Sequence, residues 1–199
     1  MSLTNHDSVP LKIPRLISLS LAFAFSVIAM SMGLNALVKS NQQKSAIRKV
    51  LPAGTSASVN DNDVFRSGAV ITAVSALIAV LSFIYILMLL LSRRLSNRLL
   101  PFEWISLAFC AVWLFATQIP FTHFFATRSA QVQAFVGTVE LPSSIVQTLQ
   151  NQLGFTNVYK DISYLRLLAI LPWFAFLFTA VAAGVSFVAS RRRVQNEKN

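Results

Sequence analysis

The sequence predicts an all-α membrane protein: a four-transmembrane-helix bundle with a short amphipathic helix in its second long outer loop. Of the 199 residues, 55% are hydrophobic and only 12% are charged, whereas soluble domains carry about 25% charged residues. The hydrophobic residues gather in four long runs. A single cysteine, Cys110, lies inside the third run and excludes an intrachain disulfide framework.

Each apolar run is long enough to cross the ~30 Å hydrocarbon core of a bilayer as a helix. We predict spans at about residues 16–38, 69–91, 102–125 and 167–189. Pro172 is tolerated in the fourth span because neighbouring helices or water can satisfy the freed carbonyl. Residues 1–199 therefore form one membrane domain, with connections at 39–68, 92–101 and 126–166 and a tail at 190–199.

The first run follows Lys12 and Arg15, a pattern that signal peptides share with uncleaved anchors. A signal peptide has an apolar region of only about 7 to 15 residues. The length of this run favours an uncleaved anchor, and cleavage near Gly33 is the alternative.

The two long connections must lie on the same side of the membrane. The first is rich in small and turn-forming residues over 52–63, which predicts a loop. The second has apolar residues at helical spacing over 144–154, a capping-box pattern at Ser144 and Gln147, and Gly154 as a stop. A short amphipathic helix there would cover the end of the bundle; the alternative is an interfacial or partner-binding helix.

Basic residues predict that both termini are cytosolic. Two clusters lie directly beside span ends, where the positive-inside rule gives arginines most weight: Arg93, Arg94 and Arg98, and Arg191, Arg192 and Arg193. Because these clusters lie beside the spans, the formal net charge of +10 indicates contact with anionic lipid headgroups rather than nucleic-acid binding. Spans of this length fit the plasma membrane and endomembranes alike.

The four-span layout, with cytosolic termini and a short inner turn, resembles that of MARVEL-type and other small tetraspan membrane proteins. The resemblance concerns layout alone, because no motif residue carries it. The single cysteine argues against tetraspanins, claudins and fungal cortical-patch tetraspans, whose outer loops contain cysteines.

Three polar residues in or beside the third span are candidate intramembrane or interface residues: Glu103, Gln118 and His123. Ionisable groups inside spans are functional candidates. For Glu103 we expect an interfacial ion pair with Arg94 or Arg98, with a proton or ion site as the alternative. For Gln118 we expect an interhelical hydrogen bond, and for His123 an interface position, because the two lie ~140° apart around a helix.

Small residues at helical spacing predict faces on which helix backbones approach closely. The candidates are Ser18, Ala22, Ser26, Ala29 and Gly33 on the first span, Ala69, Ala73, Ala76 and Ala79 on the second, and Ala180 and Gly184 on the fourth. We expect internal packing, and a partner-binding face is the alternative.

No catalytic, cofactor-binding or metal-binding motif stands out. We therefore expect a non-enzymatic tetraspan membrane protein that organises, traffics or assists other membrane components, without a cofactor or nucleic acid. Its expected partners are the lipid bilayer and other membrane proteins or further copies of itself. The alternative is a small transporter or channel subunit, and a membrane enzyme comes third.

Overall fold

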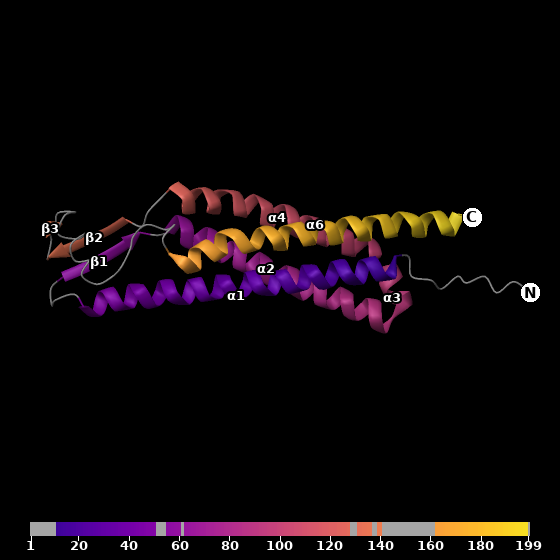
Figure 1. Cartoon of the computed structure of the whole chain (residues 1–199), viewed down its shortest axis with the longest axis horizontal. Helices are drawn as coiled ribbons and strands as arrows, with labels where there is room; N and C mark the ends of the chain where they lie inside the picture. The colour runs from indigo at the N-terminus through magenta and orange to yellow at the C-terminus, as the bar shows by residue number, and fades with distance from the viewer. Residues whose placement is uncertain are drawn as a thin grey trace, which may run out of the picture.

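The computed structural model describes residues 11–50, 55–60, 62–127, 131–136, 139–140 and 162–198. Four long helices run side by side, and a short helix links the second to the next (Figure 1). These helices are α1 (Lys12–Val50), α2 (Asn62–Leu91), α3 (Arg93–Arg98), α4 (Leu100–Thr127) and α6 (Ser163–Lys198).

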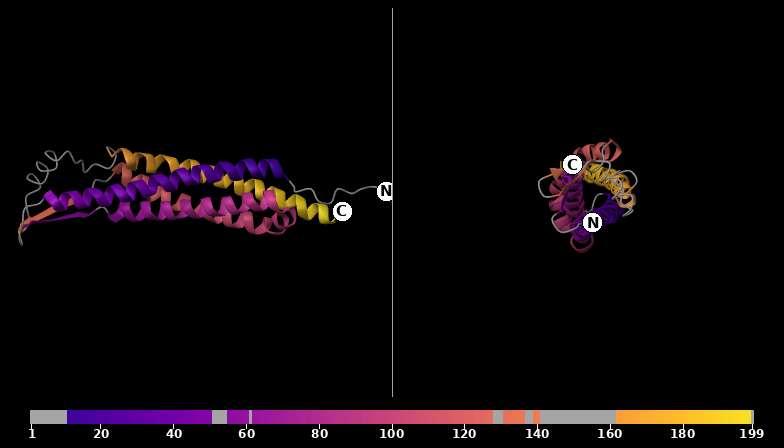
Figure 2. Two further views of the ribbon diagram at one scale, coloured as in Figure 1. Left: turned by 90° about the horizontal axis from the view of Figure 1, so that it is seen from below. Right: turned by 90° about the vertical axis from the view of Figure 1, so that its left-hand side faces the viewer.

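The four long helices form a closed ring around a common interior. α1 packs against α2 and α6, and α4 packs against the same two helices, so α1 and α4 face each other across the bundle (Figure 2). Each helix contains a stretch long and apolar enough to cross a membrane: Lys12–Gln42, Phe65–Leu91, Leu100–Thr127 and Leu165–Gln195. The predicted four-helix bundle is confirmed, and the chain is a multi-pass integral membrane protein.

Large apolar side chains cover the outside of the bundle. Phe102 is 62% exposed, Val112 67% and Leu91 81%. Such a surface is suited to lipid, where every backbone group must be satisfied within the helices. The interior holds two apolar clusters, one centred on Ile78, Leu114 and Phe121 and the other on Leu19 and Leu107.

The short connection between the second and third spans is helical. Ser92 is the N-cap of α3, with φ −141° and ψ 101°, and its side chain accepts a hydrogen bond from the Leu95 amide. Leu99 ends α3 and donates to the Leu95 carbonyl, and α4 begins at Leu100. α3 therefore lies at the end of the bundle where α1 begins and α6 ends (Figure 1).

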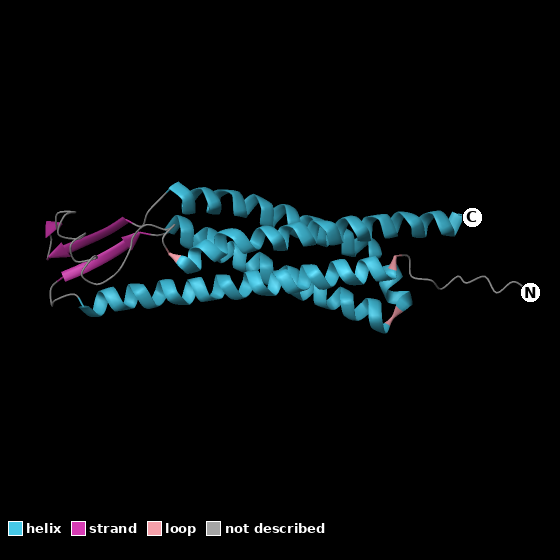
Figure 3. Cartoon of the chain, in the orientation of Figure 1, coloured by secondary structure: helices cyan, strands magenta, loops and turns pink. Residues whose placement is uncertain are grey.

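A small antiparallel sheet lies at the opposite end of the bundle (Figure 3). β1 (Thr55–Asn60) pairs with β2 (Gln131–Val136), with Thr55 opposite Val136 and Asn60 opposite Gln131. β2 pairs in turn with β3 (Val139–Glu140). Because β1 comes from the first long connection and the other two strands from the second, the sheet ties these connections together.

The sequence did not predict these strands. Residues 39–68 were expected to form a loop, but α1 continues to Val50, β1 follows, and α2 begins at Asn62. The polar segment of β1 becomes a strand by pairing with β2, a partner more than seventy residues away that local pattern cannot identify. The predicted amphipathic helix at 144–154 lies outside the described residues.

Candidate functional site

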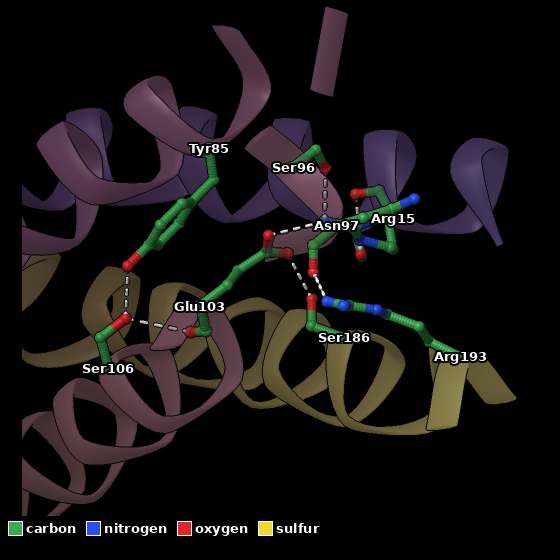
Figure 4. A network of polar contacts seen from close by, with 9 residues as sticks. Arg15, Tyr85, Ser96, Asn97, Glu103, Ser106, Ser186 and Arg193 are labelled. Carbon is green, nitrogen blue, oxygen red and sulfur yellow. Dashed lines mark hydrogen bonds and ion pairs between the residues drawn. The ribbon is translucent and has the colours of Figure 1, made fainter. Parts of the chain in front are cut away.

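A buried ion pair joins the two helices that face each other across the bundle (Figure 4). Nη2 of Arg15, near the start of α1, is 2.7 Å from Oε2 of Glu103, in the first turn of α4. Their side chains are 0% and 3% exposed. The carboxylate also lies near the N-terminus of α4, where the helix dipole favours negative charge.

Two serines from the neighbouring helices complete this site. Ser96 of α3 accepts a hydrogen bond of 3.2 Å from Nη2 of Arg15. Ser186 of α6 donates a hydrogen bond of 2.6 Å to Oε1 of Glu103. We call Arg15, Ser96, Glu103 and Ser186 the polar clasp, since together they join four helices at one end of the bundle.

A further pair of contacts connects α2 to the same place. Ser106 donates to the backbone carbonyl of Glu103 at 3.0 Å, and its Oγ lies 2.7 Å from Oη of Tyr85. Since the single hydroxyl proton of Ser106 goes to that carbonyl, Tyr85 is the donor in the second bond. All the long helices therefore have a polar contact at or next to the clasp.

The position of Arg15 corrects the expectation for Glu103. Glu103 was expected to pair with Arg94 or Arg98 near the headgroups, but both arginines are exposed on α3 and Glu103 is buried against Arg15. The physical reason is the face on which Arg15 lies. It precedes Ser18 and Ala22 at helical spacing, so it shares the inward face of α1 with the small residues.

Burial of the Arg15–Glu103 ion pair costs free energy, and removal of one partner costs more. Removing two charges from water costs several kcal/mol per ion, and their attraction and hydrogen bonds only about offset that cost. Removing one partner leaves a buried, uncompensated charge. Within the described part of the chain, Nη2 of Arg15 has hydrogen-bond partners, whereas Nε and Nη1 of the same guanidinium have none.

Gln118 and His123 lie on different sides of α4. Gln118 is fully buried and donates from Nε2 to the backbone carbonyl of Ala169 on α6, at 2.8 Å. This is an interhelical hydrogen bond of the kind expected from the sequence. His123 is exposed, next to the ring of Phe124. The structure therefore does not bring the two residues into one site.

The small residues of α1 form the inward face of that helix. Ser18, Ala22, Ser26, Ala29 and Gly33 are all buried. At Gly33 the approach of α2 is closest, because a Cβ atom added there would lie 1.9 Å from Oγ1 of Thr72. Gly33 is therefore required by the packing of α1 against α2.

Unlike the small residues of α1, those proposed for α2 and α6 are not all buried. Ala69 and Ala180 are half-buried, whereas Ala73 and Gly184 are exposed. Nothing lies within 4 Å of a Cβ atom added at Gly184. Internal packing is thus the wrong role for Ala73 and Gly184. Ala76 is half-buried, and Ala79 is buried as internal packing requires. The other buried residues of α2 include larger or hydroxylated ones: Ile71, Thr72, Val74, Ser75 and Ile78.

The basic anchors gather at the clasp end of the bundle. Arg94 and Arg98 are exposed on α3, and Arg191 and Arg192 are exposed near the end of α6. Arg193 donates a hydrogen bond from Nη1 to the backbone carbonyl of Asn97 on α3 (Figure 4). The side chain of Arg93 lies outside the described residues.

Within the part of the chain that the structure describes, no three His, Cys, Asp or Glu residues gather to hold a metal ion. No family model matches the chain, and neither a curated protein nor a solved structure matches it. The absence of a cofactor and of catalysis stays a prediction from the sequence.

Proposed function

We propose that this protein is a non-enzymatic membrane-organising or accessory protein that acts through helix packing and its outer loops. One observation carries the proposal: strands from both long connections pair into a single sheet beyond the membrane-crossing bundle. Pairing distant segments gives the outer part of the protein a defined shape that a partner could recognise. The helices then act as the stem that holds this sheet.

The packing of the stem supports a structural role. Ile78, Leu114 and Phe121 are fully buried between the helices, and the charged groups of the clasp are paired with each other. A scaffold requires a bundle that keeps one arrangement, and charge-assisted hydrogen bonds between helices favour one arrangement over others.

The outward-facing small residues support contact with other membrane helices. Ala73 and Gly184 are exposed on the lipid-facing surface, where small residues allow a second helix to approach closely. The partner would be another membrane protein or a second copy of this chain.

The proposed orientation places both termini and α3 in the cytosol and the sheet on the opposite side. The two arginine clusters next to the span ends support it. Single cysteines at Ser56 and Gln195, introduced separately into a Cys110→Ser background, test it with an impermeant thiol reagent. We expect labelling at residue 56 on intact cells if the protein is at the surface, and labelling at residue 195 only after permeabilisation. The opposite pattern would invert the orientation.

Photo-crosslinking from within the spans tests the proposed role. A photoreactive amino acid is placed at Ala73 or Gly184, with the buried neighbours Ser75 and Ala182 on the same helices as matched controls. We expect a discrete protein adduct from the exposed positions in native membranes and only intramolecular products from the controls. Lipid adducts alone from all four positions would contradict a helix-mediated role.

A transporter or channel subunit is the second candidate, and the ion pair inside the bundle favours it, since intramembrane charges often mark ion or proton paths. Flux through proteoliposomes distinguishes the two. A transporter requires flux that Glu103→Gln alters and that the outer-sheet control Glu140→Gln does not. A scaffold predicts no flux from wild type or from either variant.

A further inference from the structure

Two arginine clusters that are far apart in the sequence lie at the same end of the bundle. One belongs to the segment 92–101, which contains no acidic residue, and the other to the tail 190–199, in which Glu197 lies five residues after Arg192. Glu103 lies nearby, but its charge is neutralised by Arg15. The four exposed arginines, Arg94, Arg98, Arg191 and Arg192, therefore outnumber the acidic residues of these two segments.

Polar contacts on two sides fix the position of α3. On one side, Ser96 accepts the hydrogen bond from Arg15 of the clasp. On the other side, the carbonyl of Asn97 accepts the hydrogen bond from Arg193 of α6. Because both contacts involve adjacent residues of one short helix, the exposed Arg94 and Arg98 are carried on a fixed support. Preorganisation of this kind lowers the entropy lost when a ligand binds.

Apolar side chains lie directly beside these cations. Leu95 is exposed between the two arginines of α3, and Phe187 is partly exposed below those of α6. The guanidinium of Arg191 lies over the Phe187 ring, with its Cζ atom 4.8 Å from the ring centroid. A cation held against an apolar ring at the end of a span is placed where lipid headgroups meet acyl chains.

We propose that Arg94 and Arg98 of α3, together with Arg191 and Arg192 of α6, bind the phosphate groups of anionic phospholipids. We call these four residues the arginine surface. Guanidinium groups match phosphate oxygens with two parallel hydrogen bonds, and the adjoining leucine and phenylalanine contact the acyl chains. The ligand is thus a membrane lipid rather than a soluble phosphate. This inference goes beyond the scaffold role and stands independently of it.

Lipid retention by the purified full-length protein tests the proposal. The protein is exchanged into nanodiscs of phosphatidylcholine, with or without phosphatidylserine, and the affinity for phosphatidylserine is measured by native mass spectrometry and by fluorescent-lipid competition. The variants are Arg94→Gln/Arg98→Gln and Arg191→Gln/Arg192→Gln. The matched control is Arg66→Gln/Arg166→Gln, which removes two exposed arginines from the opposite end of the bundle.

Each double variant at the arginine surface is expected to lose about fivefold in affinity per arginine removed, while the control keeps the wild-type affinity. Equal losses in all three variants would overturn the proposal, because attraction would then depend on net charge alone. Equally tight binding of soluble glycerophosphoserine, which has the same headgroup without acyl chains, would also overturn it, since the acyl chains would then contribute nothing.

A charge-neutral variant tests the role of α3 as a support. Ser96→Ala removes the hydrogen bond that joins α3 to Arg15 and leaves every arginine in place. It is therefore expected to weaken phosphatidylserine binding by less than either double variant. The control is Ser31→Ala, which removes an exposed hydroxyl bonded within α1 and should leave binding unchanged. Unchanged binding in Ser96→Ala would overturn the fixed-support part of the proposal.

Discussion

The two halves of the bundle are held together by different physical means. At the α3 end, the polar clasp joins the helices through a few short, charge-assisted hydrogen bonds. In the half nearer the sheet, α1 and α2 approach closely at Gly33 and Thr72. There α4 and α6 are joined by the hydrogen bond from Gln118 and by contacts of the Phe115 ring with Trp173 and Phe176. Lipid removes the usual advantage of burying apolar surface, so helix order depends on charge-assisted bonds at the α3 end and mainly on close fit in the other half.

The largest expected loss of stability is at the polar clasp. Arg15→Met leaves the buried Glu103 carboxylate without its partner and should destabilise the protein by about 3 to 5 kcal/mol. The double variant Arg15→Met/Glu103→Gln contains no buried charge and should recover most of that loss. Unfolding by denaturing detergent, followed by tryptophan fluorescence, measures both. A double variant as unstable as the single one would show that the pair itself, rather than the orphaned charge, supplies the stability.

Close fit is tested at Gly33. Gly33→Ala forces a Cβ atom into Thr72 and should cost about 1 to 3 kcal/mol, measured in the same unfolding assay. Adding Thr72→Gly should restore part of the stability. The matched control is Gly184→Ala, which meets open space and should be neutral or slightly stabilising. Equal destabilisation at both glycines would point to backbone flexibility rather than to helix contact.

The hydrogen bond between Gln118 and Ala169, in the half nearer the sheet, predicts a smaller effect. Gln118→Leu removes the donor to the Ala169 carbonyl and should destabilise the protein by about 1 kcal/mol. Thr122→Val serves as the control, because its hydroxyl bonds within α4 to the Gln118 carbonyl. If Gln118→Leu cost as much as Arg15→Met, the contrast between the two halves would fail.

The smallest effect is expected at the edge of the clasp. Tyr85→Phe removes the hydroxyl that bonds to Ser106 and should cost about 0.6 kcal/mol. Ser106→Ala should cost slightly more, because it also removes the bond to the Glu103 carbonyl. The double variant should cost less than the sum, because both changes remove the bond between the two hydroxyls. Fully additive losses in the double-mutant cycle would mean that the two hydroxyls act separately.

The face of α1 could be read from the sequence, and that of α2 could not. On α1, small residues recur at spacings of three and four and all are buried. α2 is apolar around its whole circumference, so its alanines do not indicate an inward direction. There the buried positions include Thr72, Ser75 and Ser82, which hydrogen-bonding preferences alone would not assign to a membrane interior.

Part of the candidate site could be predicted from the sequence. Glu103 was identified as a candidate and expected to form an interfacial ion pair, but its partner lies 88 residues away along the chain, and the nearer arginines on α3 were a more obvious choice. The position of Arg15 in register with Ser18 and Ala22 was the signal that could have identified it. Ser96 and Ser186 gave no such signal, because serine is common in membrane helices and its partners depend on tertiary arrangement.

The length of α1 has a consequence for the space around the membrane. This helix has 39 residues, whereas about 20 are enough to cross the hydrocarbon. If crossing begins near Leu16, the remaining turns extend roughly 20 Å beyond the hydrocarbon core before the chain reaches the sheet. α1 therefore works as a spacer that sets the distance between the sheet and the lipid.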